Sequence, residues 1–184
     1  MVVKKITRFA LVAVLLLLVV LAGCTDKNRI KPAIKDANLI AMNYAAADNL
    51  ITSAGGILTK SKPLLITSFV NIDDLRASST FGRITSEQVG SKFSQSGYPV
   101  IEMKLRSSVF IKEQSGEFIL SRALKSLSTS HDAQAVLAGT YAVGTNVVYV
   151  TSKLIRTSDG VILSSYDYVL PIGPDTRALL RTRR

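Results

Sequence analysis

Residues 146–170, NVVYVTSKLIRTSDGVILSSYDYVL, contain the pattern that decides the fold. Successive side chains of an extended chain point to opposite faces, so residues 146–156 present one apolar face and one partly polar face. The apolar face carries Val148, Val150 and Leu154, and the other carries Tyr149, Thr151 and Lys153. The Asp159-Gly160 pair that follows favours the positive φ of a tight turn. The stretch therefore predicts a hairpin of two antiparallel strands, 146–156 and 161–170.

Three further strands are predicted upstream of this hairpin. Residues 63–70 and 133–141 are apolar runs of strand length, and residues 98–105 include alternating apolar positions. The run at 63–70 alternates poorly, which is typical of a strand that is covered on both faces. A polar loop is expected at 71–80. A helix between 63–70 and 98–105 favours pairing of these two as neighbouring parallel strands.

Three helices are predicted to pack on the sheet. The first spans 36–53, with Asp36 as its N-cap, and its two apolar faces indicate that it is mostly buried or meets a partner. The second spans 80–96, with a capping-box pattern that offers Thr85 as an alternative start. The third spans 115–127. The sequence thus predicts an α/β fold (α+β mixed) with a mixed β-sheet of about five strands and three helices packed on it, closing in an antiparallel meander.

The amino terminus has the architecture of an export signal. Lys4, Lys5 and Arg8 precede an apolar run, 9–21, that ends in small residues before Cys24. An ordinary membrane-spanning helix is the alternative, because residues 6–23 are just long enough to cross a bilayer.

The segment Leu21-Ala-Gly-Cys24 resembles the bacterial lipobox. That resemblance implies cleavage before Cys24, a diacylglycerol on its thiol and an acyl chain such as palmitate on the new amino terminus. Thr25, rather than an aspartate, follows Cys24, and in lipoproteins similar to this one that difference points to the outer membrane. The predicted organisation is a signal peptide (1–23), a lipidated tether (24–35), an α/β domain (36–171) and a basic C-terminal tail (172–184).

Composition restricts the classes of partner. The chain has 23 basic and 13 acidic residues, a net charge of +10, and removal of Lys4, Lys5 and Arg8 with the signal leaves +7. This charge favours binding to anionic surfaces such as lipopolysaccharide, phospholipid head groups or peptidoglycan. The basic C-terminal tail is expected either to be disordered or to lie against such a surface. The absence of Trp argues against a base-stacking surface for nucleic acid. The single cysteine allows no disulfide.

The residues offer little for catalysis. His131 is the only histidine and is followed by Asp132, but adjacent residues rarely face each other, and no nucleophile-elbow pattern is present. One His and one Cys are too few ligands for zinc. Residues 139–145 have the glycine spacing of a P-loop, but Thr145 stands where its lysine is needed. The glutamates 87, 102, 113 and 117 form no distinguishable catalytic pair. The sequence predicts a protein that is not an enzyme, with no metal, cofactor or small-molecule substrate beyond the covalent lipid.

Several segments resemble the FlgO-type flagellar outer-membrane lipoproteins. They are ANLIAMNYAAADNL, PLLITSFVNIDDL, SSTFGRITSEQVGSKFSQSGYPVIEMKLR, GEFILSRAL and AVLAGTYAVGTNVVYVTSKLIRTSDGVILSSYDYVLP. The most specific part is FGR-x-x-SEQ, Phe81–Gln88. The strand pair around Ser-Asp-Gly is shared more widely, with curli-secretion lipoproteins and the N-terminal domain of TolB. The resemblance covers about residues 36–171 and implies a mixed sheet with helices packed on it.

The resemblance implies a role in flagellar assembly or stability, and hence in motility, at the outer membrane of a Gram-negative bacterium. Partners would be flagellar basal-body or outer-membrane proteins, and copies of the chain could form a ring. The candidate partner contacts are Phe81, Arg83, Ser86, Glu87 and Gln88, together with the 71–80 loop and an edge of the closing sheet. For Phe81 and Arg83, simple helix packing is the competing interpretation. The alternative function is a periplasm-facing lipoprotein that regulates peptidoglycan synthesis or polymer secretion.

Overall fold

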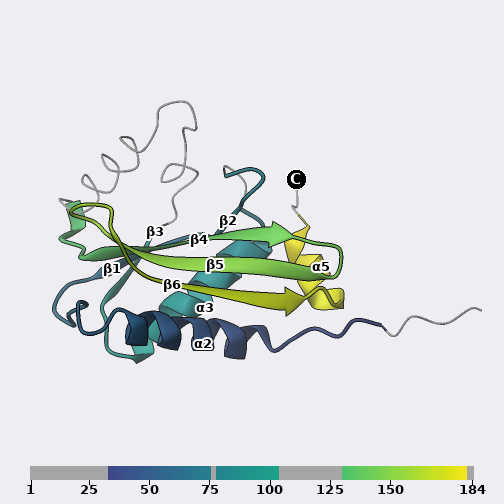
Figure 1. Cartoon of the computed structure of the whole chain (residues 1–184), viewed down its shortest axis with the longest axis horizontal. Coiled ribbons are helices and arrows are strands. Elements are labelled where there is room, and N and C mark those ends of the chain that lie inside the picture. The colour runs from purple at the N-terminus through teal and green to yellow at the C-terminus, as the bar shows by residue number, and fades with distance from the viewer. Residues whose placement is uncertain (1–32, 76–77, 104–129, 182–184) are drawn as a thin grey trace, which may run out of the picture. The chain divides into compact units, whose positions relative to one another are not determined.

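The computed structural model describes residues 33–75, 78–103 and 130–181, and these form one mixed sheet with helices packed on it (Figure 1). The sheet runs in the order β3-β1-β4-β5-β6, and β2 pairs with β4 beside this path. The elements are α2 (Leu39–Ser53), β1 (Leu64–Thr67), β2 (Val70–Asn71), α3 (Thr80–Gln95), β3 (Val100–Met103), β4 (Ala135–Val143), β5 (Val147–Arg156), β6 (Ile162–Pro171) and α5 (Pro174–Leu180). The predicted helix at 115–127 lies outside the described residues.

The closing meander is confirmed. Strands β4 and β5 pair antiparallel from Ala135↔Arg156 to Val143↔Val148, and β6 continues the pattern against β5. In the β5–β6 turn, Gly160 has φ 77°. The Asp159 carboxylate accepts a hydrogen bond from the Val161 amide at 3.1 Å. The turn therefore has both the positive φ and the side-chain-to-backbone hydrogen bond that Asp-Gly pairs are suited to make.

The predicted parallel pair is also confirmed. Strand β1 pairs parallel with β3 in the register Leu64↔Val100, and α3 connects the two strands along the chain. On its other side, β1 pairs parallel with β4. All four residues of β1 are buried, as expected for a strand covered on both faces. The predicted run 63–70 is interrupted, however, because the Phe69 amide donates to the carbonyl of Gly82 at 3.2 Å. Val70 and Asn71 then pair with β4 as the separate strand β2, which makes six strands instead of about five.

The two faces of the sheet carry separate apolar clusters. The larger cluster joins α2 and α3 to the sheet through side chains such as Leu50, Phe81 and Phe93, which are fully buried. The opposite face carries a smaller cluster formed by Leu65, Ala133, Val136, Ala138 and Ile155. Val148, Val150 and Leu154 are buried, whereas Tyr149 is exposed, so the expected two faces of β5 are confirmed.

Asp36 does not cap the helix that follows it. Asn38 is the N-cap of α2, and its side chain accepts a hydrogen bond from the Ala41 amide at 3.0 Å. The Asp36 carboxylate instead accepts from the amides of Asp175 and Thr176, both at 2.9 Å, at the start of α5. Residues 174–180, which the sequence assigned to a basic tail, therefore contain a helix whose first amides are held by the beginning of the domain.

We expect this contact to make folding sensitive to acid. Hydrogen bonds from Thr176, foremost its side chain, and from the Asp175 and Gly173 backbone hold the pKa of Asp36 below its usual 3.8, although partial burial opposes this. A lowered folded-state pKa adds stability that is fully present above the unfolded value and is lost as pH falls through the folded value.

Urea denaturation of wild type and Asp36→Asn checks this expectation. The wild-type advantage should be present at about pH 6 and should shrink at about pH 3, where the carboxylate becomes protonated. An advantage of equal size at both pH values would mean that Asp36 does not titrate with folding.

Candidate functional site

The family-specific stretch Phe81–Gln88 forms the first turns of α3, and hydrogen bonds from β4 set where this helix begins. Ser79 is the N-cap, and its hydroxyl accepts from the Gly82 amide at 3.3 Å. Tyr141 donates its hydroxyl to Ser79 Oγ at 2.9 Å and accepts from the Ser79 amide at 3.2 Å. The alternative start at Thr85 is wrong, because Thr85 is buried one turn inside the helix.

Phe81 and Gly82 join the start of α3 to the sheet. The Phe81 side chain is fully buried and packs edge-to-face on Tyr141, with ring centroids 5.3 Å apart. An alanine Cβ at Gly82 would lie 2.1 Å from the carbonyl oxygen of Phe69. The helix thus approaches the backbone of the sheet as closely as a glycine permits.

Arg83 and Glu87 are the exposed members of the stretch. The Arg83 guanidinium donates to the Ser78 carbonyl at 3.0 Å and to Thr80 Oγ1 at 3.1 Å. These bonds fold the side chain back over the helix start, so the helix-packing interpretation describes part of its role. Its exposed surface and that of Glu87, four positions further on, lie on the same side of the helix.

Ser86 and Gln88 face inward. The Ser86 hydroxyl donates to the Arg83 carbonyl at 2.8 Å, and its side chain is buried. Gln88 Oε1 accepts from Asn43 Nδ2 of α2 at 2.7 Å. Asn43 is fully buried, and its Oδ1 accepts the hydroxyl of Tyr168 from β6. A three-residue chain of hydrogen bonds therefore links both helices to the closing strand.

This polar chain is a feature that the sequence interpretation missed. The signal in the sequence was Asn43, a polar residue on the apolar face of the first helix, because a buried polar side chain needs a hydrogen-bond partner. Burial raises the pKa of the Tyr168 phenol well above its ordinary value, so this group stays a neutral donor. Thr85 Oγ1 is buried and has no hydrogen-bond partner among the described residues.

The five predicted contact residues therefore divide into two groups. Direct contact with a partner does not fit Phe81 and Ser86, because their side chains are buried in the folded domain. Gln88 is partly buried and already bonded to Asn43. Arg83 and Glu87 keep a surface that another protein can reach. The specificity of the FGR-x-x-SEQ stretch thus reflects, in large part, the packing of α3 on the sheet.

The other two candidate surfaces lie at the margins of the sheet. In the 71–80 loop, Ile72 is exposed, and its amide donates to the Tyr141 carbonyl at 3.0 Å. Asn71 Oδ1 accepts from the Asp73 amide at 3.0 Å, as in an Asx turn. Strand β6, ten residues long, is one edge of the sheet, and β3 is the edge at the other side.

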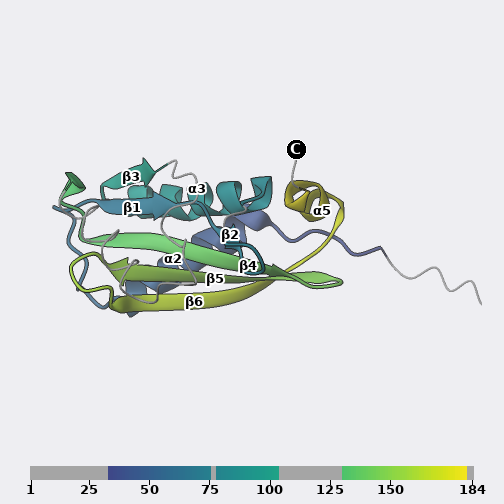
Figure 2. The same cartoon turned by 90° about the horizontal axis from the view of Figure 1, so that it is seen from above.

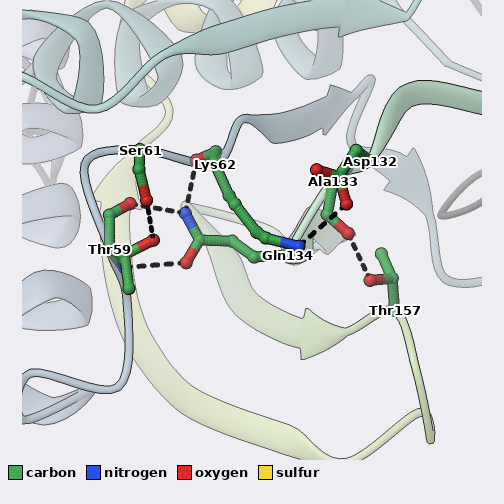
Figure 3. A network of polar contacts seen from close by, with 7 residues as sticks. All are labelled: Thr59, Ser61, Lys62, Asp132, Ala133, Gln134 and Thr157. Atoms are coloured by element: carbon green, nitrogen blue, oxygen red, sulfur yellow. Dashed lines mark hydrogen bonds and ion pairs between the residues drawn. The ribbon is translucent and has the colours of Figure 1, made fainter.

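Asp132, the neighbour of the lone histidine, belongs to a structural network (Figure 3). Its carboxylate accepts from Lys62 Nζ at 2.8 Å, and both side chains are largely exposed. The Gln134 amide group accepts from the Thr59 amide at 2.8 Å and donates to the Thr59 carbonyl at 2.7 Å. Thr157 donates its hydroxyl to the Ala133 carbonyl. These bonds fasten the 59–62 loop and the end of β5 to the beginning of β4.

The charge of the described part differs from that of the whole chain. Residues 33–75, 78–103 and 130–181 contain nine basic and ten acidic side chains, so the positive excess belongs to the remaining sequence. Among the described residues, no three His, Cys, Asp or Glu side chains gather as metal ligands. In the same ranges, no helix combines the length and hydrophobicity that crossing a bilayer requires.

Comparison with known proteins identifies the family. The C-terminal domain of LpoB from Salmonella enterica is similar, with 13% sequence identity and a TM-score of 0.51, covering 72% of this chain and 98% of that one. The same domain from Escherichia coli shows 12% identity and a TM-score of 0.52, with the same coverage. At these identities the likeness shows a shared fold alone. No curated protein matches the sequence. The family model described as FlgO protein matches residues 44–175, most of the chain, and the chain therefore belongs to the FlgO family.

Proposed function

We propose that this protein is an outer-membrane lipoprotein that contributes to flagellar assembly or stability, and so to motility, through protein–protein contacts. The observation that carries the proposal is the family match over residues 44–175, downstream of the lipobox cysteine Cys24. We infer no chemical reaction, since His131 is exposed and Asp132 is paired with Lys62.

Local concentration is the mechanism that the chain supports. Two or more acyl chains on Cys24 would hold the protein stably in a membrane. The tether, residues 24–35, reaches at most roughly 40 Å when fully extended. A domain confined to such a layer meets membrane partners at a high effective concentration, so contacts that are weak in solution become effective.

The exposed surface around Arg83 and Glu87, the loop at 71–80 and the β6 edge are the proposed partner contacts. Arg83 is held by its hydrogen bonds to Ser78 and Thr80, so part of the entropy cost of binding has already been met in the free protein.

Loss of the anchor is the primary test. Cys24→Ser should remove the protein from the outer-membrane fraction and reduce swimming to the level of a deletion strain, because the serine hydroxyl does not take the lipid. Thr25→Ser, the neighbouring conservative change, should leave both unaltered. Envelope fractionation and soft-agar motility measure the two results. A Cys24→Ser protein that stays in the outer-membrane fraction of swimming cells would contradict the proposal.

The same strains discriminate the alternative function. Deletion should abolish motility with normal cell shape if the protein serves the flagellum. Sensitivity to cell-wall stress or failed polymer secretion, in cells that swim, would instead support the periplasmic regulator. Crosslinking of the intact lipoprotein in outer membranes should recover flagellar components. Arg83→Glu should weaken that recovery, whereas Lys153→Glu on the opposite face of the sheet should not.

A further inference from the structure

Among the described residues, exposed apolar side chains lie at both ends of the sheet: Ile57, Val161 and Ile162 at one end, and five others at or beside the end formed by the β4–β5 hairpin. We call this the hairpin end and define it as Ala142–Tyr149 together with Val169–Thr176. In the described ranges, eight large apolar side chains are exposed, and three of them, Val143, Tyr149 and Val169, belong to the hairpin end at 46%, 55% and 45% exposure. Two more exposed side chains lie beside it. Ile40 comes four residues after Asp36, whose carboxylate is bonded to the start of α5, and the Ile72 amide donates to the Tyr141 carbonyl.

The hairpin presents these side chains on both of its faces. Tyr149 and Val169 are cross-strand neighbours and point away from the face that α2 and α3 cover. Val143 lies two residues beyond Tyr141, whose ring packs on that helix-covered face, so Val143 points to the same side. The turn between β4 and β5, residues 144–146, is exposed and uncharged. The projecting tip is therefore apolar along both sides, without a charged residue at its apex.

The chain enters the domain at this same end. Asp36 is bonded to the amides of Asp175 and Thr176, and the Ile172 amide donates to the Asn146 carbonyl at 2.8 Å. Figures 1 and 2 both show residues 33–38, α5 and the β4–β5 turn at one end of the sheet. Only residues 24–35 separate this point from Cys24. The tether from Cys24 therefore joins the domain at the hairpin end, and not at the opposite end, where the β5–β6 turn lies.

We propose that the hairpin end docks on the lipid bilayer that holds the anchor, with Tyr149, Val143 and Val169 in the interfacial layer. This rests on the anchoring in the proposed function. Tyrosine suits that layer because its ring is apolar and its hydroxyl is polar. Acidic Asp73, Asp74 and Asp175 lie at this end as well as Arg177 and Arg181, so the contact is made by apolar side chains and does not depend on anionic lipid. The tether removes most of the entropy cost of the encounter, so a small apolar surface is sufficient.

The absence of Trp from the sequence allows a direct test with single reporters. Lipidated full-length protein carrying Tyr149→Trp is reconstituted in vesicles of phosphatidylethanolamine and phosphatidylglycerol, with and without brominated acyl chains. The matched control is Ile162→Trp at the opposite end, where the native side chain is 50% exposed. Both proteins are tethered equally, so only docking distinguishes them. We expect brominated lipid to quench about half of the Tyr149→Trp fluorescence and almost none of the Ile162→Trp fluorescence.

Each outcome decides the proposal. Equal, weak quenching of both reporters on protein that floats with the vesicles would overturn docking and leave the anchor intact. A blue shift of Tyr149→Trp that depends on protein density, without quenching, would show that a second copy covers this end and would also overturn it. Protein that fails to float would contradict the anchoring in the proposed function, and docking would fall with it. Circular dichroism of both variants checks that each is folded.

Discussion

Gly82→Ala should destabilise the domain by about 3 kcal/mol or more, because the new methyl group would meet backbone and not a movable side chain. Its Cβ would lie 2.1 Å from the Phe69 carbonyl oxygen and 3.0 Å from both Ser78 Oγ and Tyr141 Cε1. Relief requires α3 to move away from the sheet. That movement breaks the hydrogen bond from the Phe69 amide to the Gly82 carbonyl and exposes Phe81.

Gly90→Ala, two turns later in the same helix, is the matched control. Its Cβ would approach only the side chain of Ile66, at 3.2 Å, and alanine gains about 1 kcal/mol of helix propensity over glycine. We expect a net change within about 1 kcal/mol. Urea denaturation followed by far-UV circular dichroism measures both variants. Equal unfolding midpoints would show that α3 is not in contact with the Phe69 backbone as described.

Gly139→Ala should lower the free energy of unfolding by a similar amount, about 3 kcal/mol, for a different reason. Gly139 lies in the middle of β4, and an added Cβ would be 2.5 Å from Phe69 Cδ2 and Cε2 and 2.6 Å from Cζ. Phe69 is fully buried, so its ring has no free space into which it can rotate. The clash is with a side chain, and a second substitution can remove it.

Phe69→Ala tests that assignment through a double-mutant cycle. Alone it should destabilise by about 3–5 kcal/mol, because it leaves a cavity. Combined with Gly139→Ala, the total should fall short of the sum by about 2 kcal/mol, since the ring that causes the clash is gone. Combined with Gly82→Ala, no such relief is expected, because the Phe69 carbonyl remains. If the losses of unfolding free energy from Phe69→Ala and Gly139→Ala were additive, the Phe69 ring would not lie against Gly139.

The elements that local pattern specifies were predicted well from the sequence. The two faces of β5, the Asp-Gly turn and the strand–helix–strand unit of β1, α3 and β3 follow from side-chain alternation and turn chemistry within short segments. Helix boundaries were predicted less well. Both Asp36 and Asn38 can cap a helix, and only the position of α5 determines that Asp36 is used elsewhere.

The candidate site was likewise predicted only in part from the sequence. The sequence marked Phe81–Gln88 as distinctive, but pattern alone does not separate a residue that meets a partner from one that meets the core. Phe69, Tyr141 and Asn43 determine that separation, and they lie on three other elements. Arg83 and Glu87 remain as the accessible part of the stretch.

The sequence by itself determined the resemblance to a lipobox at Cys24, the mixed α/β class and the closing meander, because each depends on the order of neighbouring residues. Only the tertiary structure decided that Phe81 and Ser86 are buried, that Asp36 holds α5, and that the exposed Tyr149 and Val169 lie at the end of the sheet where the tether joins the domain. These depend on contacts between residues far apart in the chain, such as Asp36 and Thr176, whose proximity no local pattern encodes.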